Sequence, residues 1–256
     1  MIALIDGDLI AHRCAASAEN DPLDVSLERS DHLIERICDE IGASSCEVFL
    51  TGSNSFRKQI NPQYKANRKD QVPPQWLQDT REHLVMGWNA SVSDGNEADD
   101  EMGIQQCSST DDTIICSLDK DLLMVPGQHY SWYISGKTPS GTFWEKPAIR
   151  RTISPHQGLQ NFYFQLIMGD PSDNIFGYDG KARSKVPKFL EPTIGALMEC
   201  KDELEMYEYV SELYADNCSW TTDWEYTLYV NAQCLYIQQR QGDEWQKPKP
   251  HASNQD

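Results

Sequence analysis

The sequence predicts an α/β protein in which a mainly parallel central sheet is flanked by helices and followed by a helical C-terminal region. Short apolar runs alternate with helical stretches through about the first 150 residues, which is typical of strand–helix–strand units. From residue 154 onward the pattern is helical only. A length of 256 residues suits one compact α/β domain with a smaller helical lobe.

The expected strands are short, apolar and bounded by polar residues. The first covers residues 2–5 and ends in Asp6-Gly7-Asp8, so we interpret it as a buried strand whose carboxyl end presents carboxylates. The others are expected at residues 46–50, 90–92, 113–116, 129–134 and 142–144, the last two around a turn at 136–141.

The expected helices follow from apolar residues spaced three and four apart. In the helix at 31–41, for example, Leu33, Ile34, Ile37 and Ile41 share one face. The remaining helices are expected at residues 9–18, 75–86, 97–110, 155–168, 192–200, 203–214 and 223–239. These elements divide the chain into a core at 1–153, a helical region at 154–240 and a polar, frayed tail at 241–256.

Composition excludes several classes of protein. No apolar run reaches the roughly 18 residues of a membrane span, and the acidic start MIALIDGD is not that of a signal peptide. Eight scattered cysteines without a CxxC pair indicate reduced thiols in a cytoplasmic protein. The net charge of −18 does not exclude nucleic acid, because residues 56–69 and 181–188 are basic and contain no acid.

Carboxylates concentrate between Gly95 and Asp121. GNEADDE opens an expected helix, and SLDKD follows an expected strand. Strand ends and the helix starts that follow them line one edge of an open α/β sheet, so these carboxylates should meet there. Carboxylates brought together at one edge repel one another, and hard divalent cations, which prefer oxygen ligands, would offset that repulsion. The alternative is that the acids favour a helix N-terminus and are otherwise solvated.

Other chemistries lack their residues. The chain has no glycine-rich phosphate loop, no serine or cysteine in a nucleophile context, and no histidines at metal-ligand spacing. Metal-assisted hydrolysis is the chemistry that remains.

Five motifs in order, IDGDLIAHR, FRKQINPQYKANR, EADDE, SLDKDLL and MGDPSDNI, resemble the 5′→3′ exonuclease and flap-endonuclease family, most of all the smaller 5′→3′ exonucleases of tailed phages. The resemblance runs from residue 1 to about 190 and more weakly to about 240. It implies a PIN-like or resolvase-like core that includes a helical arch segment at about 56–87. It also implies a helix-hairpin-helix type of DNA-binding region after it.

The resemblance also assigns residues to roles. It implies metal ligands at Asp6, Glu97, Asp99, Asp100, Asp119, Asp121, Asp170 and Asp173. It implies catalytic basic residues at Arg13, Lys65 and Arg68, the last two gripping the scissile phosphate. It implies DNA contacts from Tyr64, Arg57, Lys181, Arg183, Lys185 and Lys188, with Tyr64 able to stack on a base.

Two departures from the family pattern stand out. Gly52 occupies the place of an aspartate that usually binds the first metal, and Asp8 is a candidate to compensate. After DNI, the sequence FGYDGKA lacks the usual proline, and Ala182 replaces the last glycine, so a monovalent-ion site there is in doubt.

The implied activity is a two-metal 5′→3′ exonuclease or flap endonuclease acting on DNA with a free 5′ end and on RNA/DNA hybrids. Its cofactor would be two Mg²⁺ ions, for which Mn²⁺ can substitute. The protein is expected to be a monomer in the cytoplasm, that of a bacterial host if phage-encoded, with no membrane partner. Two alternatives stay open, a PIN-type ribonuclease and a branched-DNA-binding protein that no longer cleaves.

Overall fold

The computed structural model describes residues 1–138 and 140–250, which form two compact units. The first unit comprises residues 1–55, 72–154 and 237–242, and the second comprises 56–71, 155–236 and the chain from 243 onward. Of the expected arch segment at about 56–87, residues 56–71 fall in the second unit and residues 72–87 in the first. None of the helices in the described residues is long and apolar enough to cross a membrane.

A six-stranded sheet of order β3-β2-β1-β4-β5-β8 forms the centre of the first unit. Its strands are β1 (Ile2–Asp6), β2 (Ser45–Leu50), β3 (Ser91–Val92), β4 (Thr113–Cys116), β5 (Gly127–Ser131) and β8 (Ile149–Ile153). All neighbours are parallel except β5 and β8, so the predicted mainly parallel sheet is confirmed. Parallel sheets need cover on both faces, which explains why β1 and β4 are apolar along their length.

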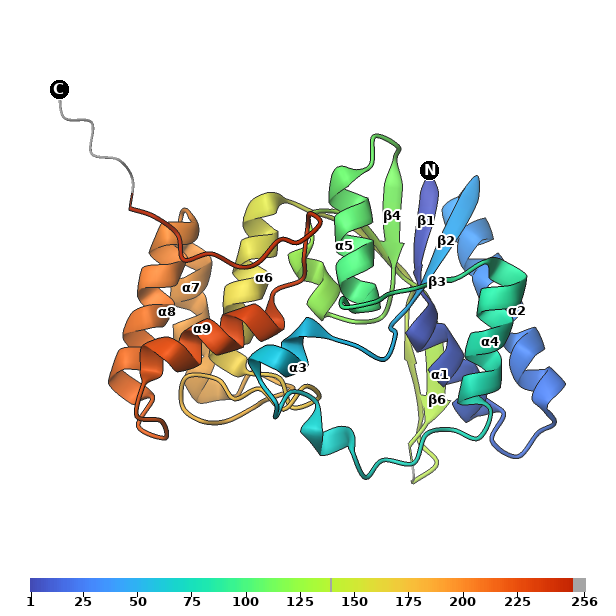
Figure 1. Ribbon diagram of the computed structural model, residues 1–256, viewed down its shortest axis with the longest axis horizontal. Coiled ribbons are helices and arrows are strands. Elements are labelled where there is room, and N and C mark those ends of the chain that lie inside the picture. The colour runs from blue at the N-terminus through green and yellow to red at the C-terminus, as the bar shows by residue number, and fades with distance from the viewer. Residues whose placement is uncertain (139, 251–256) are drawn as a thin grey trace. The chain divides into compact units, whose positions relative to one another are not determined.

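Helices cover both faces of this sheet. Helices α1 (Gly7–Ser17), α2 (Leu23–Ile41) and α4 (Leu77–Trp88) pack together on one face. Helix α5 (Ala98–Ser108) packs on β1, β2 and β4 and lies apart from these three helices, on the other face (Figure 1). The 3₁₀ turn η2 (Asp121–Met124) connects β4 to β5.

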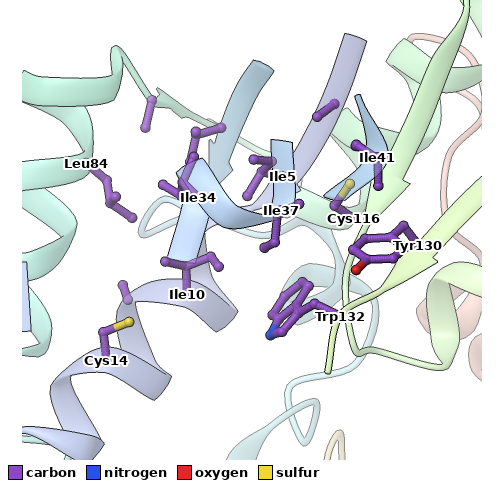
Figure 2. Packing of buried hydrophobic residues seen from close by; sticks show 14 of the residues in the cluster. Ile5, Ile10, Cys14, Ile34, Ile37, Ile41, Leu84, Cys116, Tyr130 and Trp132 are labelled. Carbon is purple, nitrogen blue, oxygen red and sulfur yellow. The ribbon is translucent and has the colours of Figure 1, made fainter. Parts of the chain in front are cut away.

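The core lies between the sheet and the three-helix layer. Ile5 and Cys116 from neighbouring strands meet Ile10 of α1, Ile34 of α2 and Leu84 of α4, all nearly inaccessible to solvent (Figure 2). Burial of each such side chain contributes about 1.5–3 kcal/mol. This packing fixes the carboxyl ends of the strands, where the candidate site residues begin.

Helix α2 starts eight residues earlier than predicted. Its first two turns bury Ser26 and Ser30 instead of apolar side chains, so no hydrophobic periodicity predicts a helix there. The Ser26 hydroxyl pairs at 2.8 Å with the Thr80 hydroxyl of α4, which satisfies both buried groups.

The segment after β5 also differs from its prediction. The expected strand at 129–134 is divided at buried Trp132, where the chain leaves the main sheet. A separate antiparallel hairpin, β6 (Ile134–Lys137) and β7 (Phe143–Lys146), follows, and β8 then returns to the sheet edge. The predicted turn at 136–141 overlaps the connection of this hairpin, but residues 136 and 137 belong to β6, and residue 139 lies outside the described residues.

The second unit is mainly helical, as predicted. It contains α3 (Phe56–Ile60), η1 (Ala66–Arg68), α6 (Pro155–Met168), η3 (Lys188–Leu190), α7 (Glu191–Glu199), α8 (Glu203–Asn217) and α9 (Trp224–Leu235). Helix α9 ends four residues earlier than predicted, at an extended Tyr236. Within the tail predicted at 241–256, Trp245 is buried and its carbonyl accepts from Gln233 Nε2. Residues 251–256 lie outside the described residues.

Candidate metal and nucleic-acid site

The carboxyl edge of the sheet in the first unit brings Asp6 and Asp119 together. Asp6 ends β1, and the parallel register places Ile5 beside Cys116, the last residue of β4. The Ser117 hydroxyl donates to Asp6 Oδ2 at 2.7 Å and accepts from the Asp119 backbone N–H at 2.9 Å. Asp119 Oδ1 in turn accepts from the Asp121 N–H at 2.9 Å. Ser117, the first residue of SLDKD, was missed by the sequence reasoning although it directly follows a strand.

Asp6 is electrostatically unusual. Burial raises the pKa of its carboxyl to about 6, and nearby Asp119 adds to the rise, although hydrogen bonds from Ser117 and the Leu9 N–H oppose it. Because this folded-state pKa lies above the value of about 4 in unfolded chains, protonated Asp6 favours folding, and that stabilisation is lost as the pH rises from about 4 to about 6. At neutral pH the edge therefore holds negative charge at a cost that a cation would offset.

The acidic residues at the start of α5 cap the helix. Glu97 is the N-cap and forms a capping box with Asp100, whose Oδ2 accepts from the Glu97 N–H at 3.0 Å. Asp100 is fully buried, and its Oδ1 accepts from the Gln238 N–H at 3.1 Å. Asp100 thus satisfies two backbone donors. The preceding residue, Asp99, is half-buried. Asp100 therefore has the helix-start role of the alternative interpretation, whether or not it also binds a cation.

The end of β2 fixes the start of α5 and explains the glycine at position 52. The Thr51 hydroxyl accepts from the Ala98 N–H at 2.9 Å, and the Gly52 N–H donates to the Ser93 hydroxyl at 3.2 Å. A Cβ at Gly52 would lie 2.1 Å from the Ser93 carbonyl oxygen, so an aspartate there would require the backbone to move.

Asp8, the candidate to compensate for the missing carboxylate, is bound to the protein through both oxygens. Its Oδ2 accepts from the Thr51 N–H at 2.8 Å, and its Oδ1 accepts from Arg81 of α4, which also donates to the Thr51 carbonyl. Asp8 and Arg81 therefore hold the end of β2 in place. Arg81 was not singled out from the sequence, where it is one charge on an amphipathic helix.

The first unit presents oxygen donors of the kind that hard divalent cations prefer, with no histidine or cysteine among them. Asp6, Asp119 and the start of α5 lie at one edge of the sheet. Within residues 1–138 and 140–250, no three such side chains are already gathered closely enough to hold a metal ion. The donor chemistry fits Mg²⁺ or Mn²⁺, and ligation would require the carboxylates to converge.

In the second unit, the YKANR segment is docked on the DPSDN turn. The Lys65 N–H donates to the Asp173 carbonyl at 2.9 Å, and Asn67 Nδ2 donates to the Pro171 carbonyl at 2.7 Å. Arg68 donates to the Ser172 carbonyl at 2.9 Å and to Asp173 Oδ1 at 2.7 Å. Two motifs about a hundred residues apart therefore form one structural site, which their sequences did not reveal.

Asp173 is the centre of that site. Its carboxylate is 15% exposed, accepts from the Tyr64 hydroxyl at 2.9 Å, and has Lys65 Nζ at 3.9 Å. Burial raises the pKa of Asp173, while Lys65, Arg68 and Tyr64 counter that effect. The neighbouring Asp170 is buried, and its Oδ1 accepts from the N–H and hydroxyl of Ser172, both at 2.6 Å. The structure thus joins predicted metal ligands and predicted phosphate-binding residues directly.

Two residues predicted to contact DNA are buried in this structure. Arg57 is buried, and its guanidinium donates to the Cys234 and Tyr236 carbonyls at 2.8 and 2.7 Å. A cation at the carbonyls that end a helix is favourable, so Arg57 anchors α3 to the end of α9 rather than facing solvent. Tyr64 is also buried, so its ring does not offer a stacking surface for a base in this conformation.

Replacing Arg57 by methionine should lower stability by about 3 kcal/mol, because two buried carbonyls would lose charge-assisted hydrogen bonds. We expect the melting temperature to fall by roughly 5–10 °C. Lys58→Met, on the same helix but exposed, is the matched control and should melt within about a degree of the wild type. An Arg57→Met protein that melts normally but binds DNA poorly would restore the original assignment.

The remaining basic residues lie where DNA could reach them. Lys181, Lys185 and Lys188 are exposed, and Arg13 is half-buried in α1. Arg183 pairs with Asp179 through both terminal nitrogens and lies 5.7 Å from the ring of exposed Phe189. Gly180 has a φ of +72°, and the Trp220 ring covers the position of its missing Cβ at 2.7 Å. The altered FGYDGKA loop is therefore held by side chains of the second unit.

Comparison with solved structures shows that the chain shares the fold of phage 5′-exonucleases and flap endonucleases. The particular relatives come from bacteriophage T5. Its 5′-exonuclease with bound zinc aligns at TM-score 0.62 and 18% identity, covering 91% of this chain and 88% of that one. Its flap endonuclease in a complex with DNA and metal ions aligns at TM-score 0.60 and 16% identity, covering 91% of this chain and 89% of that one. A further T5 structure, crystallised with metal ions, aligns at TM-score 0.58 and 18% identity, covering 91% of this chain and 89% of that one.

These identities show a shared fold, and the fold expected from the motif resemblance is confirmed. No protein-family model matches the sequence.

Proposed function

We propose that this protein is a divalent-metal-dependent 5′→3′ exonuclease or flap endonuclease that hydrolyses phosphodiester bonds of DNA. The observation that carries the proposal is the pairing of Asp6 and Asp119 through Ser117 at the carboxyl edge of the sheet. Support comes from the T5 5′-nucleases, which share the fold and were crystallised with metal ions and, in one case, with DNA.

The carboxylates of the first unit would hold the cofactor. Asp6, Glu97, Asp99 and Asp119 provide hard oxygen donors, with Asp121 beside them. When bound, two Mg²⁺ ions would supply an activated water and would stabilise the leaving oxygen. Mn²⁺ is expected to substitute. Asp100 stays in the proposed ligand set, because its oxygens, which accept from the Glu97 and Gln238 N–H groups, each have a second lone pair for a cation.

The basic pair of the second unit would bind the scissile phosphate. Arg68 is 45% exposed and Lys65 is 22% exposed, and their positions are fixed by the DPSDN turn. Charge that grows on the phosphoryl oxygens would be offset by groups already oriented, which requires no reorganisation during the reaction. Asp170 and Asp173 would orient this pair, and their carboxylates are further candidate oxygen donors for a cation.

Duplex DNA would be held mainly by its backbone. Lys181, Lys185 and Lys188 form an exposed basic stretch that can neutralise phosphates without reading sequence. We expect substrates with a free 5′ end, including RNA/DNA hybrids, short products with 5′-phosphates, and a monomeric enzyme in the cytoplasm of the host cell.

The test is cleavage of a 5′-labelled DNA duplex and a matched RNA, each with Mg²⁺ and with excess EDTA. The proposal predicts Mg²⁺-dependent loss of label from the DNA as short 5′-phosphorylated products, and none in EDTA. Cleavage of RNA alone would favour the PIN-type ribonuclease. Tight binding of a branched DNA without cleavage in Mg²⁺ or Mn²⁺ would favour the non-cleaving binding protein.

A further inference from the structure

The β6–β7 hairpin of the first unit is unusually exposed. Every residue from 141 to 150 is exposed, including Phe143 at 58% and Trp144 at 37%. Tyr133, which leads into β6, is 37% exposed. Exposed aromatic side chains gathered on one short hairpin indicate a binding surface more often than they indicate packing.

The surroundings of this hairpin are basic in an otherwise acidic chain. Within the first unit, residues 122–154 contain a single acid, Glu145, although the whole chain carries 40 acidic residues in 256. The same stretch contains Lys137, Lys146, Arg150 and Arg151. Glu145 Oε2 accepts from the Tyr133 hydroxyl at 2.9 Å. The surface therefore suits a negatively charged partner.

The hairpin rises from the edge of the sheet that carries Asp6 and Asp119. Strand β5 runs parallel to β4, and β4 runs parallel to β1, so their carboxyl ends share one edge. The chain passes from Ser131, the last residue of β5, into β6 within three residues. Figure 1 shows β6 beyond the carboxyl ends of β1 and β4.

The register of the hairpin separates its two faces. Ile134 pairs with Lys146 and Gly136 with Trp144, and on this face Ile134 is buried and the Trp144 ring lies against Gly136. The opposite face carries Tyr133, the cross-strand pair of Lys137 and Phe143, and the neighbouring pair of Ser135 and Glu145, whose carboxylate accepts from the Tyr133 hydroxyl. Paired side chains on one face of a hairpin lie about 5 Å apart, so an aromatic ring and an ammonium group point outward together.

We propose that this outward face binds single-stranded nucleic acid, with a base stacked on Phe143 and a phosphate at Lys137. Single-strand binding surfaces combine these two features, because every base has a stacking face and every linkage carries one negative charge. The inference deepens the proposed function: the bound strand would be the unpaired part of the substrate next to the carboxylate edge.

The test is fluorescence anisotropy of a labelled dT₁₀ oligonucleotide in EDTA, where cleavage cannot occur. Phe143→Leu, which keeps an apolar side chain but removes the aromatic ring, should weaken binding about tenfold, and Phe143→Trp should bind as the wild type does. Lys137→Gln should weaken binding and reduce the slope of log K against log salt by about 0.7, the value for one lost phosphate contact on a single strand. Tyr226→Leu is the control, since Tyr226 is 61% exposed but directly follows Glu225 in the acidic first turn of α9, whose N-cap is Asp223.

Unchanged dT₁₀ binding by both Phe143→Leu and Lys137→Gln would overturn the proposal. Weak binding by Phe143→Trp would also overturn it, since an aromatic ring would then be insufficient. If Phe143→Leu instead abolishes a concentration-dependent dimer in sedimentation velocity and leaves dT₁₀ binding intact, the face joins two copies of this chain. Failure of the nuclease proposal appears separately, as absence of Mg²⁺-dependent cleavage of a blunt duplex by the wild type.

Discussion

Asp119→Asn should reduce DNA cleavage by at least about 10³-fold while leaving the fold intact. The asparagine keeps the Oδ1 acceptor for the Asp121 N–H and the backbone N–H that donates to Ser117. What it loses is the negative charge beside Asp6, and with it affinity for the cation that the reaction requires. Single-turnover cleavage of a 5′-labelled duplex in saturating Mg²⁺ measures the effect.

The same variant should respond less to metal in a melting experiment. Mg²⁺ binding to the folded state alone raises the melting temperature of the wild type by mass action, and Asp119→Asn should blunt that rise. Asp111→Asn, an exposed substitution before the amino end of β4, is the control and should retain both cleavage and the shift. Full activity of Asp119→Asn would remove Asp119 from the reaction.

Arg68→Met should lower kcat/KM for DNA by about 10²-fold, the second-largest effect expected. The guanidinium is held by the Ser172 carbonyl and the Asp173 carboxylate, so its position is fixed before substrate arrives. Its ion pair with Asp173 is half-exposed and should contribute no more than about 1 kcal/mol to stability, so the loss should not reflect unfolding.

Arg68→Lys separates charge from geometry at this position. Lysine keeps the positive charge but cannot bridge Ser172 and Asp173 with one planar group, so we expect a loss of about tenfold in kcat/KM. Lys69→Met, one residue further along and exposed, should cleave as the wild type does. Equal rates for Arg68→Met and the wild type would show that the arginine anchors the DPSDN turn without taking part in cleavage.

The meeting of carboxylates at the carboxyl edge of the sheet could be predicted, because it depends only on the residues that end each strand. Apolar strands that end in acids, in a parallel sheet, bring those acids to one side whatever the remaining sequence. Asp6 and Asp119 met that rule, and the structure places them in one hydrogen-bonded group. The start of α5 could be predicted from an equally local rule, because acidic residues favour a helix N-terminus.

What the sequence could not predict depends on contacts between distant segments. A basic residue within FRKQ is expected to face solvent, but the end of α9 offers Arg57 two carbonyls, and these outweigh that expectation. The docking of YKANR on DPSDN joins residues 68 and 173 through backbone carbonyls, which leave no compositional signal. Likewise, only the position of the Ser93 carbonyl explains why residue 52 is a glycine.

The most direct measurement of the central claim is anomalous scattering from a crystal soaked in Mn²⁺. The structure predicts a Mn²⁺ peak within about 2–2.5 Å of carboxylate oxygens of both Asp6 and Asp119. Anomalous peaks confined to other carboxylates, with Asp6 and Asp119 still joined only through Ser117, would contradict a metal-dependent reaction at this edge.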